Sequence, residues 1–408
     1  MAVQLSAPNA EDLLPVKGVR LASHYCGIRK AERDDLVLLE LAEGSAVAAV
    51  FTRNAFCAAP VQVAREHRRN QPTRFLLINA GNANAGTGQR GLESARASCA
   101  AVAEAAGVDA AAVLPFSTGV IGEYLPTDKI QQAVPTLLSH LQASHWLQAA
   151  EGITTTDTVA KAASQQVELT DGRQVHITGM AKGAGMLCPD MATMLAYVAT
   201  DAPIDQERLQ TLLQQLADDS FNSITVDGDT STNDACVLVA TGQVGGDTIA
   251  ADSPDEEKLL TALRTVFLTL AQACIRDGEG AQKFVELRID RARDRQEARQ
   301  LAYAIAHSPL VKTALFASDP NWGRILAVVG RAGLVDLQLD QVDIDLNGVA
   351  IVRSGERADD YTEAMGQGAM DASELIIQVA LGRGDASTSV WTCDFGYDYV
   401  RINAEYRT

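Results

Sequence analysis

The chain has 408 residues, of which 47% are hydrophobic and 21% charged, enough for two or three packed units with a sizeable core. Its 52 acidic and 34 basic residues give a formal net charge of −18, the wrong sign for a surface that must neutralise phosphates. This balance argues against nucleic acid and anionic membranes as partners.

Short apolar runs separated by turn residues predict strands, and longer stretches with helical spacing lie between them. The strands are expected at residues 36–41, 46–51, 75–78, 194–198, 235–240, 284–289 and 375–379. The helices are expected at residues 93–106, 127–141, 204–221, 254–276, 294–306 and 321–329. This alternation predicts an α/β class, mixed α+β, and a hairpin turn at Asn347-Gly348 predicts a smaller C-terminal module from about residue 340.

Two segments are rich in glycine and hydroxyl residues. Residues 79–88 lie between an apolar run and a helix, so their backbone N–H groups could face an anion, although they match no nucleotide-type phosphate loop. Residues 115–122 contain Thr118-Gly119, a step that can aim two donors at one oxyanion. An ordinary turn is the alternative interpretation of both segments.

Residues 182–195 are the most informative segment of the chain. Lys182 is followed by two glycines and a proline, and Thr193 then opens a strongly apolar run. A hydroxyl at the start of a buried strand is a candidate nucleophile if a base reaches it. The alternative is a glycine-rich turn into a core strand, with Thr193 merely half-buried.

Two acidic loops follow. The alternating acids of residues 222–234 suggest a calcium-binding loop that starts at Asp227. This interpretation fails because the sixth position of such a loop, Thr232, should be glycine, and the twelfth, Leu238, should be glutamate. A polar pocket, or turns made by Asp and Ser side chains, fits better. In the second loop, residues 277–281, Glu279 lies between two glycines. It is either part of an exposed acidic turn or a carboxylate that binds a substrate ammonium.

The remaining signals concern compartment and metals. The N-terminus lacks a basic start and an apolar leader, and no uncharged apolar run reaches the length of a membrane span. We therefore expect a cytoplasmic protein with no membrane association. Seven scattered cysteines without a C-x-x-C pair, and six dispersed histidines, predict neither a disulfide framework nor a metal site.

Taken in this order, these segments resemble the ornithine acetyltransferase family, the glutamate N-acetyltransferases of arginine biosynthesis. The matching segments cover nearly the whole chain, at residues 51–54, 79–85, 117–122, 155–158, 182–186, 191–195, 227–234, 277–281, 319–324 and 402–408. The resemblance implies a self-processing, aminopeptidase-like fold of mixed sheets packed with helices. It also implies acetyl transfer from N2-acetylornithine to glutamate without a cofactor, and it leaves acetyl-CoA open as a second donor.

The resemblance further implies that the precursor cuts itself between Ala192 and Thr193. The α chain would be residues 1–192 and the β chain residues 193–408, paired as an α2β2 heterotetramer. Thr193 would be the nucleophile, with its freed α-amine, of pKa about 7.7–8.0, as the base. Thr118 and Gly119 would form the oxyanion hole. The implied substrate-binding residues are Thr156, Lys182, Thr193, Glu279, Asn403 and Thr408.

Two other functions remain open. An amide or peptide hydrolase of the same self-processing fold would let water resolve the acyl-Thr193 intermediate. Lys182, Asn403 and Thr408 argue against it, because capture of an amino-acid carboxylate suits a transferase. A non-catalytic amino-acid-binding protein would keep an uncut chain, whereas the enzyme would give two associated fragments.

Overall fold

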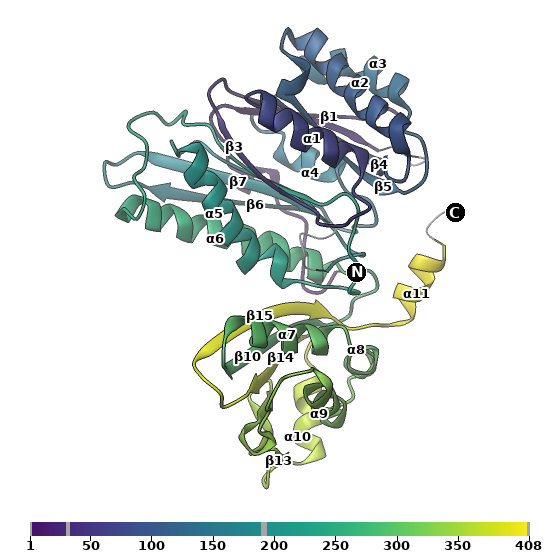
Figure 1. The fold of residues 1–408 in the computed structure, drawn as a ribbon, viewed down its shortest axis with the longest axis vertical. Coiled ribbons are helices and arrows are strands. Elements are labelled where there is room, and N and C mark those ends of the chain that lie inside the picture. The colour runs from purple at the N-terminus through teal and green to yellow at the C-terminus, as the bar shows by residue number, and fades with distance from the viewer. Residues whose placement is uncertain (1, 30–32, 189–193, 406–408) are drawn as a thin grey trace. The chain divides into compact units, whose positions relative to one another are not determined.

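The computed structural model describes residues 2–29, 33–188 and 194–405. The chain divides into two compact units, shown in Figure 1. The larger unit joins Ala7–Asn222 and Asp229–Cys274. The smaller unit joins Met1–Ser6, Ser223–Gly228 and Ile275–Thr408, and the module expected from about residue 340 lies inside it.

The larger unit contains two sheets. Its strands are β1 Val19–His24, β2 Leu36–Leu41, β3 Ala46–Phe51, β4 Phe75–Asn82, β5 Val113–Val120, β6 Lys161–Glu168, β7 Gln174–Lys182, β8 Leu195–Thr200 and β9 Ala235–Ala240. The first sheet has the order β1-β2-β4-β5 and the second β3-β9-β8-β7-β6. The helices are α1 Ala59–Asn70, α2 Gly88–Ala106, α3 Thr127–Ser139, α4 Trp146–Gly152, α5 Gln206–Asp219 and α6 Pro254–Arg276.

The first sheet is buried on both faces, which explains its continuous apolar strands. In β2, Val37 and Leu39 belong to a core that also contains Tyr197 and Val237 of the second sheet. Leu36 and Leu38 point the other way, into a core shared with α2 and α3. The alternation of strand side chains therefore places one face of the first sheet against the second sheet and the other face against α2 and α3 (Figure 1).

Helices also cover the second sheet. α5 contacts β3 and β9, and α6 places Leu270 close to Gly179 of β7. Among the described helices, α6 is long and apolar enough to span a membrane. Half of its most apolar stretch is nevertheless buried inside the protein. The buried side of α6 includes Leu270, which packs against Gly179 and contributes to the core of the larger unit.

The smaller unit is built on a six-stranded sheet of order β13-β12-β11-β14-β10-β15. Its strands are β10 Phe284–Ala292, β11 Asp343–Leu346, β12 Val349–Arg353, β13 Glu356–Arg357, β14 Glu374–Ala380 and β15 Ala386–Cys393. Its helices are α7 Arg295–Ala306, α8 Pro309–Phe316, α9 Trp322–Arg331, α10 Glu363–Met370 and α11 Tyr397–Ala404. One hydrophobic core joins the sheet to α7, α8, α9 and α10.

The structure confirms the mixed α/β class and corrects three local expectations. Thr118 and Gly119 lie in β5 rather than in a turn, and β4 runs on through Gly81 to Asn82. Lys182 is the last residue of β7 rather than part of a loop.

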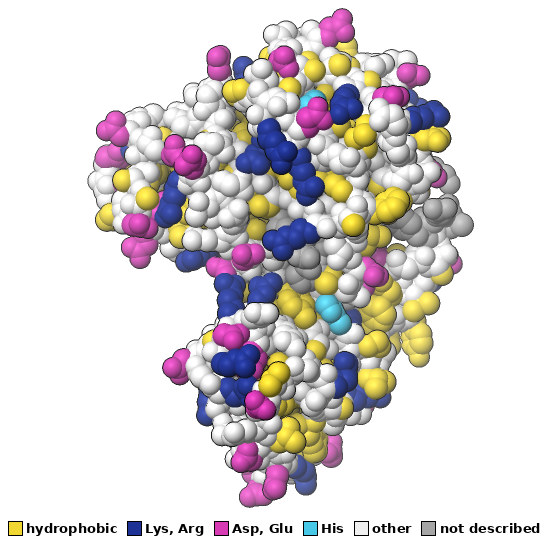
Figure 2. Space-filling view, in the orientation of Figure 1, with side chains coloured by type: hydrophobic (Ala, Val, Ile, Leu, Met, Phe, Trp, Pro, Cys, Tyr) yellow, Lys and Arg dark blue, Asp and Glu magenta, His cyan; other side chains and the backbone are white. Residues whose placement is uncertain are grey.

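Acidic side chains are scattered over the face shown in Figure 2 and do not gather in one patch.

Candidate active site

The end of β5 carries the two predicted oxyanion-hole residues. β5 pairs in parallel with β4, and Gly119 lies opposite Gly81. Gly119 has a φ of +132°, and a Cβ atom there would lie 2.2 Å from the carbonyl carbon of Gly81. Only glycine fits, because the two backbones are in contact at this point.

Polar side chains hold this strand end from behind. Ser117 Oγ donates to Asn79 Oδ1 over 2.5 Å. Asn233 Nδ2 donates to the carbonyl oxygens of Ser117 and Ala83, over 2.9 Å and 2.6 Å. All four residues are buried, so these bonds fix the backbone that presents Thr118.

The side chain of Lys182 reaches the predicted oxyanion hole. Its Nζ donates to Thr118 Oγ1 over 3.2 Å, and the lysine is only 5% exposed. In the sheet, Lys182 pairs with Leu195 at the start of β8. The structure therefore brings Lys182 and Thr118 together beside the first residues of β8.

The predicted cleavage site lies next to these residues in the sequence but outside the described ones. Ala192 and Thr193 are both in the range 189–193, which the structure does not describe. The next residue, Met194, is described and buried, and its carbonyl accepts a hydrogen bond from Ala235 N over 3.1 Å.

A buried carboxylate lies next to Lys182. Asp157 Oδ1 accepts hydrogen bonds from Lys161 Nζ over 2.6 Å and from Gly183 N over 2.7 Å. Burial alone would raise the pKa of Asp157, but the charges of Lys161 and Lys182 hold this pKa well below its usual range. Burial lowers the pKa of Lys182, and the negative charge of Asp157 opposes that effect.

Thr156 is half-buried next to Asp157 in the chain. The backbone N–H of its other neighbour, Thr155, donates to Asp157 Oδ2 over 2.9 Å, so the carboxylate also fixes this segment. A cavity of about 410 Å³ on the same segment is lined by Thr154, Asp157, Thr158, Val159, Ala160, Ala7, Arg33, Asp34, Gln148 and Glu151. Thr118, Thr156 and Lys182 do not line it.

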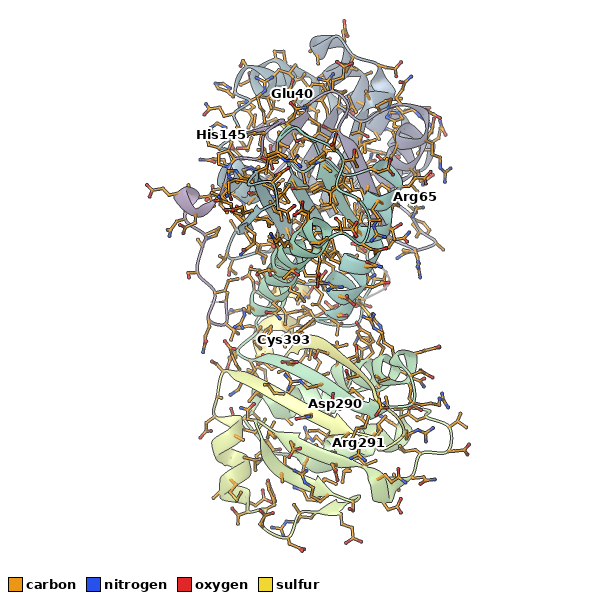
Figure 3. All side chains as sticks on the ribbon, turned by 90° about the vertical axis from the view of Figure 1, so that its left-hand side faces the viewer. Glu40, Arg65, His145, Asp290, Arg291 and Cys393 are labelled. Atoms are coloured by element: carbon orange, nitrogen blue, oxygen red, sulfur yellow. The ribbon has the colours of Figure 1, made fainter. Side chains whose placement is uncertain are left out.

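Two further predicted residues meet in the smaller unit. Phe284 at the start of β10 pairs with Cys393 at the end of β15, labelled in Figure 3, so the segments beyond both strand ends come together. Asn403 Nδ2 of α11 donates to Glu279 Oε2 over 2.7 Å, and Glu279 is 8% exposed. Thr408 lies outside the described residues.

The predicted residues thus fall into two groups. Thr118, Gly119, Thr156 and Lys182 belong to the larger unit, whereas Glu279 and Asn403 belong to the smaller one. Sequence reasoning missed Asp157 and Lys161, whose side chains are fully buried. The available signal was an acid in a hydroxyl-rich segment with a lysine four residues later, a pattern that most often marks a solvated surface pair.

Over the described residues, no three His, Cys, Asp or Glu side chains come close enough together to hold a metal ion. The acidic loop expected to face a polar pocket is divided between the units after Gly228. Asp227 accepts a hydrogen bond from the Tyr399 hydroxyl over 3.2 Å. Thr232 Oγ1 donates to Asn233 Oδ1 over 2.6 Å, so this part of the loop supports β5.

Comparison with known proteins shows clear relatives. Residues 20–408 match the model of the ArgJ family. A protein of Methylococcus capsulatus called arginine biosynthesis bifunctional protein ArgJ is 56% identical over 97% of both chains. The Pseudomonas syringae protein of the same name is 53% identical over 97% of this chain and 98% of its own. A solved ornithine acetyltransferase from Mycobacterium tuberculosis, complexed with ornithine, is 33% identical over 45% of this chain and 97% of its own, with a TM-score of 0.41.

Proposed function

Since the chain belongs to the ArgJ family and is therefore an acyltransferase of arginine biosynthesis, we propose that it carries acetyl from N2-acetylornithine to glutamate on Thr193. In the first step the Thr193 hydroxyl attacks the acetyl carbonyl, ornithine leaves with the proton, and an acetyl ester remains. In the second step the amine of glutamate attacks that ester, and the hydroxyl is regenerated. N-acetylornithine and glutamate are the small-molecule partners of this exchange.

The observation that carries this proposal is the pair formed by Lys182 and Thr118, 3.2 Å apart. The Thr118 hydroxyl and the Gly119 N–H supply donors for the oxyanion of each tetrahedral intermediate. The Lys182 ammonium supplies a charge for the α-carboxylate that both substrates carry. Because Lys182 pairs with Leu195, two residues after Thr193, the sheet register supports this role for Thr193.

The same nucleophile serves self-cleavage in this proposal. The Thr193 hydroxyl attacks the Ala192 carbonyl, the Ala192–Thr193 amide breaks, and water hydrolyses the resulting ester. The α chain of residues 1–192 and the β chain of residues 193–408 stay associated, as α2β2. Cleavage frees the α-amine of Thr193, which titrates at about 7.7–8.0 and takes the proton of its own hydroxyl.

The remaining predicted residues are assigned to substrate binding in this proposal. Glu279 holds the side-chain ammonium of ornithine, Asn403 keeps that carboxylate in place, and Thr156 and Thr408 provide hydroxyls. The chemistry needs no cofactor, because nucleophile, base and oxyanion donors all come from the chain. We propose acetyl-CoA as a second acetyl donor and the cytoplasm as the compartment.

Intact mass and a transfer assay test this function together. The purified protein is denatured for mass analysis and N-terminal sequencing, and a native sample is incubated with N-acetylornithine and glutamate. We expect two fragments, the second starting at Thr193, and equal amounts of ornithine and N-acetylglutamate. Ornithine without N-acetylglutamate would show a hydrolase, and an uncut chain that releases neither product would show a binding protein. A parallel assay replaces N-acetylornithine with acetyl-CoA.

The Thr118→Ala variant tests the oxyanion role of the hydroxyl. We expect kcat to fall about 10²-fold, because one donor to the developing negative charge is lost. The measurement is steady-state kcat, corrected for the cleaved fraction determined by mass. An unchanged kcat in a folded, cleaved variant would remove Thr118 from the oxyanion hole.

Glu279→Gln separates the two half-reactions. The amide keeps an oxygen for Asn403 but loses the charge for the ornithine ammonium. We expect kcat/KM for N-acetylornithine to fall roughly 10–100-fold, the worth of a charge-assisted hydrogen bond. The constant for glutamate should not fall, because glutamate brings no side-chain cation. Equal losses for both substrates would contradict the assignment, and separate titrations of the two substrates measure the difference.

A further inference from the structure

The Asp157–Lys161 pair has no part in the proposed chemistry, although it lies directly beside Lys182. Both side chains are fully buried, and their 2.6 Å contact is an ion pair. Burying a carboxylate and an ammonium costs several kcal/mol per ion before their attraction is counted. Lys161 is the first residue of β6, and Asp157 lies in the segment just before it. Both are therefore close to the end of β7, which carries Lys182.

The side chain of Asp157 binds backbone groups of neighbouring segments. Its carboxylate accepts from Gly183 N, the residue after Lys182, over 2.7 Å, and from Thr155 N over 2.9 Å. Lys161 opens β6 and pairs with Ala181, the residue before Lys182. The ion pair therefore contacts the chain on both sides of Lys182, through the carboxylate of Asp157 at Gly183 and through the backbone of Lys161 at Ala181.

We infer that Asp157 is a positioning residue of the acetyl-transfer site, which holds Lys182 in place and in its charged form against Thr118, with Lys161 as its counter-charge. The inference rests on the proposed function of Lys182 and Thr118. That function assigns no role to Asp157 or Lys161. The carboxylate acts through Lys182 and does not touch the acetyl group.

The electrostatics of the region support this role. The carboxylate of Asp157 is ion-paired with Lys161, and its negative charge also acts on the nearby ammonium of Lys182. Burial lowers the pKa of Lys182, the charge of Asp157 raises it, and Lys161 lowers it. Two further groups face Lys182, Cys274 of α6 and Asp234 before β9, and both raise this pKa. Asp157 is thus the largest counterweight to burial, and it keeps a cation ready for the substrate carboxylate.

The sign of the pH effect follows from these charges. Lys182 binds a carboxylate only while it is protonated, so kcat/KM falls as pH rises through the pKa of Lys182. Asp157→Asn removes the carboxylate that raises this pKa, so the fall should begin at least about one pH unit lower. Lys161→Met removes a like charge, and the fall should begin at higher pH. The acid limb belongs to the Thr193 α-amine and serves as an internal reference.

The experiment measures kcat/KM for N-acetylornithine between pH 6 and about 10. The variants are Asp157→Asn, Lys161→Met, the double variant and the control Asp201→Asn. Asp201 is also a buried carboxylate that accepts a backbone N–H of β7, from His176 over 2.8 Å, at the other end of the strand. We expect at least about 10-fold lower kcat/KM for Asp157→Asn at high pH, which is what a limb one pH unit lower produces, and an unshifted basic limb for the control.

The double variant keeps the test decisive if Asp157→Asn alone does not fold. It leaves no unpaired charge at the site of the ion pair, and its basic limb should lie between those of Asp157→Asn and the wild type, because Asp157 outweighs Lys161. A basic limb at the wild-type pH, in either folded variant that lacks the carboxylate, would overturn the inference. Failure of the proposed function is distinguishable, because the unmodified chain would then transfer no acetyl.

Discussion

Thr193→Ala is expected to give a single chain of 43.3 kDa with no acetyl transfer. The substitution removes the hydroxyl that attacks the Ala192 carbonyl, so the Ala192–Thr193 bond stays intact. It also removes the acetyl acceptor, and the uncut chain has no free α-amine to act as a base. The expected loss is complete for both cleavage and turnover, and denaturing intact mass and the transfer assay measure it.

Thr193→Ser is the matched control, because serine keeps a hydroxyl at the same position. Fragments starting at residue 193 and measurable turnover are expected, at a rate below that of the wild type. An alanine variant that is nevertheless cut, or that transfers acetyl, would assign the nucleophile to another residue. A serine variant that remains uncut while folded would show that a hydroxyl alone is not sufficient.

Strands whose residues are nearly all apolar could be located from the sequence. The predicted strands at 36–41, 46–51 and 235–240 coincide with β2, β3 and β9, each buried by neighbours on both faces. The sequence of β6 has neither an apolar run nor a polar–apolar alternation and so carries no such signal. β5 was missed because Ser117, Thr118 and Gly119 interrupt its apolar run, and these residues serve the site.

The candidate site could be predicted in part. The Lys182 and Thr118 pair follows from two segments that resemble the family, and the structure brings the two side chains to 3.2 Å. Asp157 could not be found, because its importance depends on burial beside Lys161, and a single sequence does not show which Asp–Lys pairs are buried. Gly119 illustrates the same limit. Its φ of +132° and the adjacent Gly81 backbone are visible only once β4 and β5 are paired.

Gly119→Ala is expected to have a large effect on both stability and activity. The added Cβ would lie 2.2 Å from Gly81 C and 2.5 Å from Asn82 N, and backbone cannot move aside as a flexible side chain can. The positive φ adds about 1–2 kcal/mol of strain. The β4–β5 contact must open, which displaces the Thr118 hydroxyl and the N–H of residue 119, so kcat should fall at least about 10²–10³-fold.

Gly122→Ala is the control for Gly119→Ala, because it separates strain in the backbone from the steric clash. Gly122 also has a positive φ, +85°, but a Cβ there meets nothing within 4 Å. Thermal melts followed by circular dichroism should show a small decrease in Tm for Gly122→Ala and a much larger one for Gly119→Ala. Equal decreases would show that φ alone matters at residue 119. The close approach of β4 would then contribute nothing to the position of the oxyanion donors.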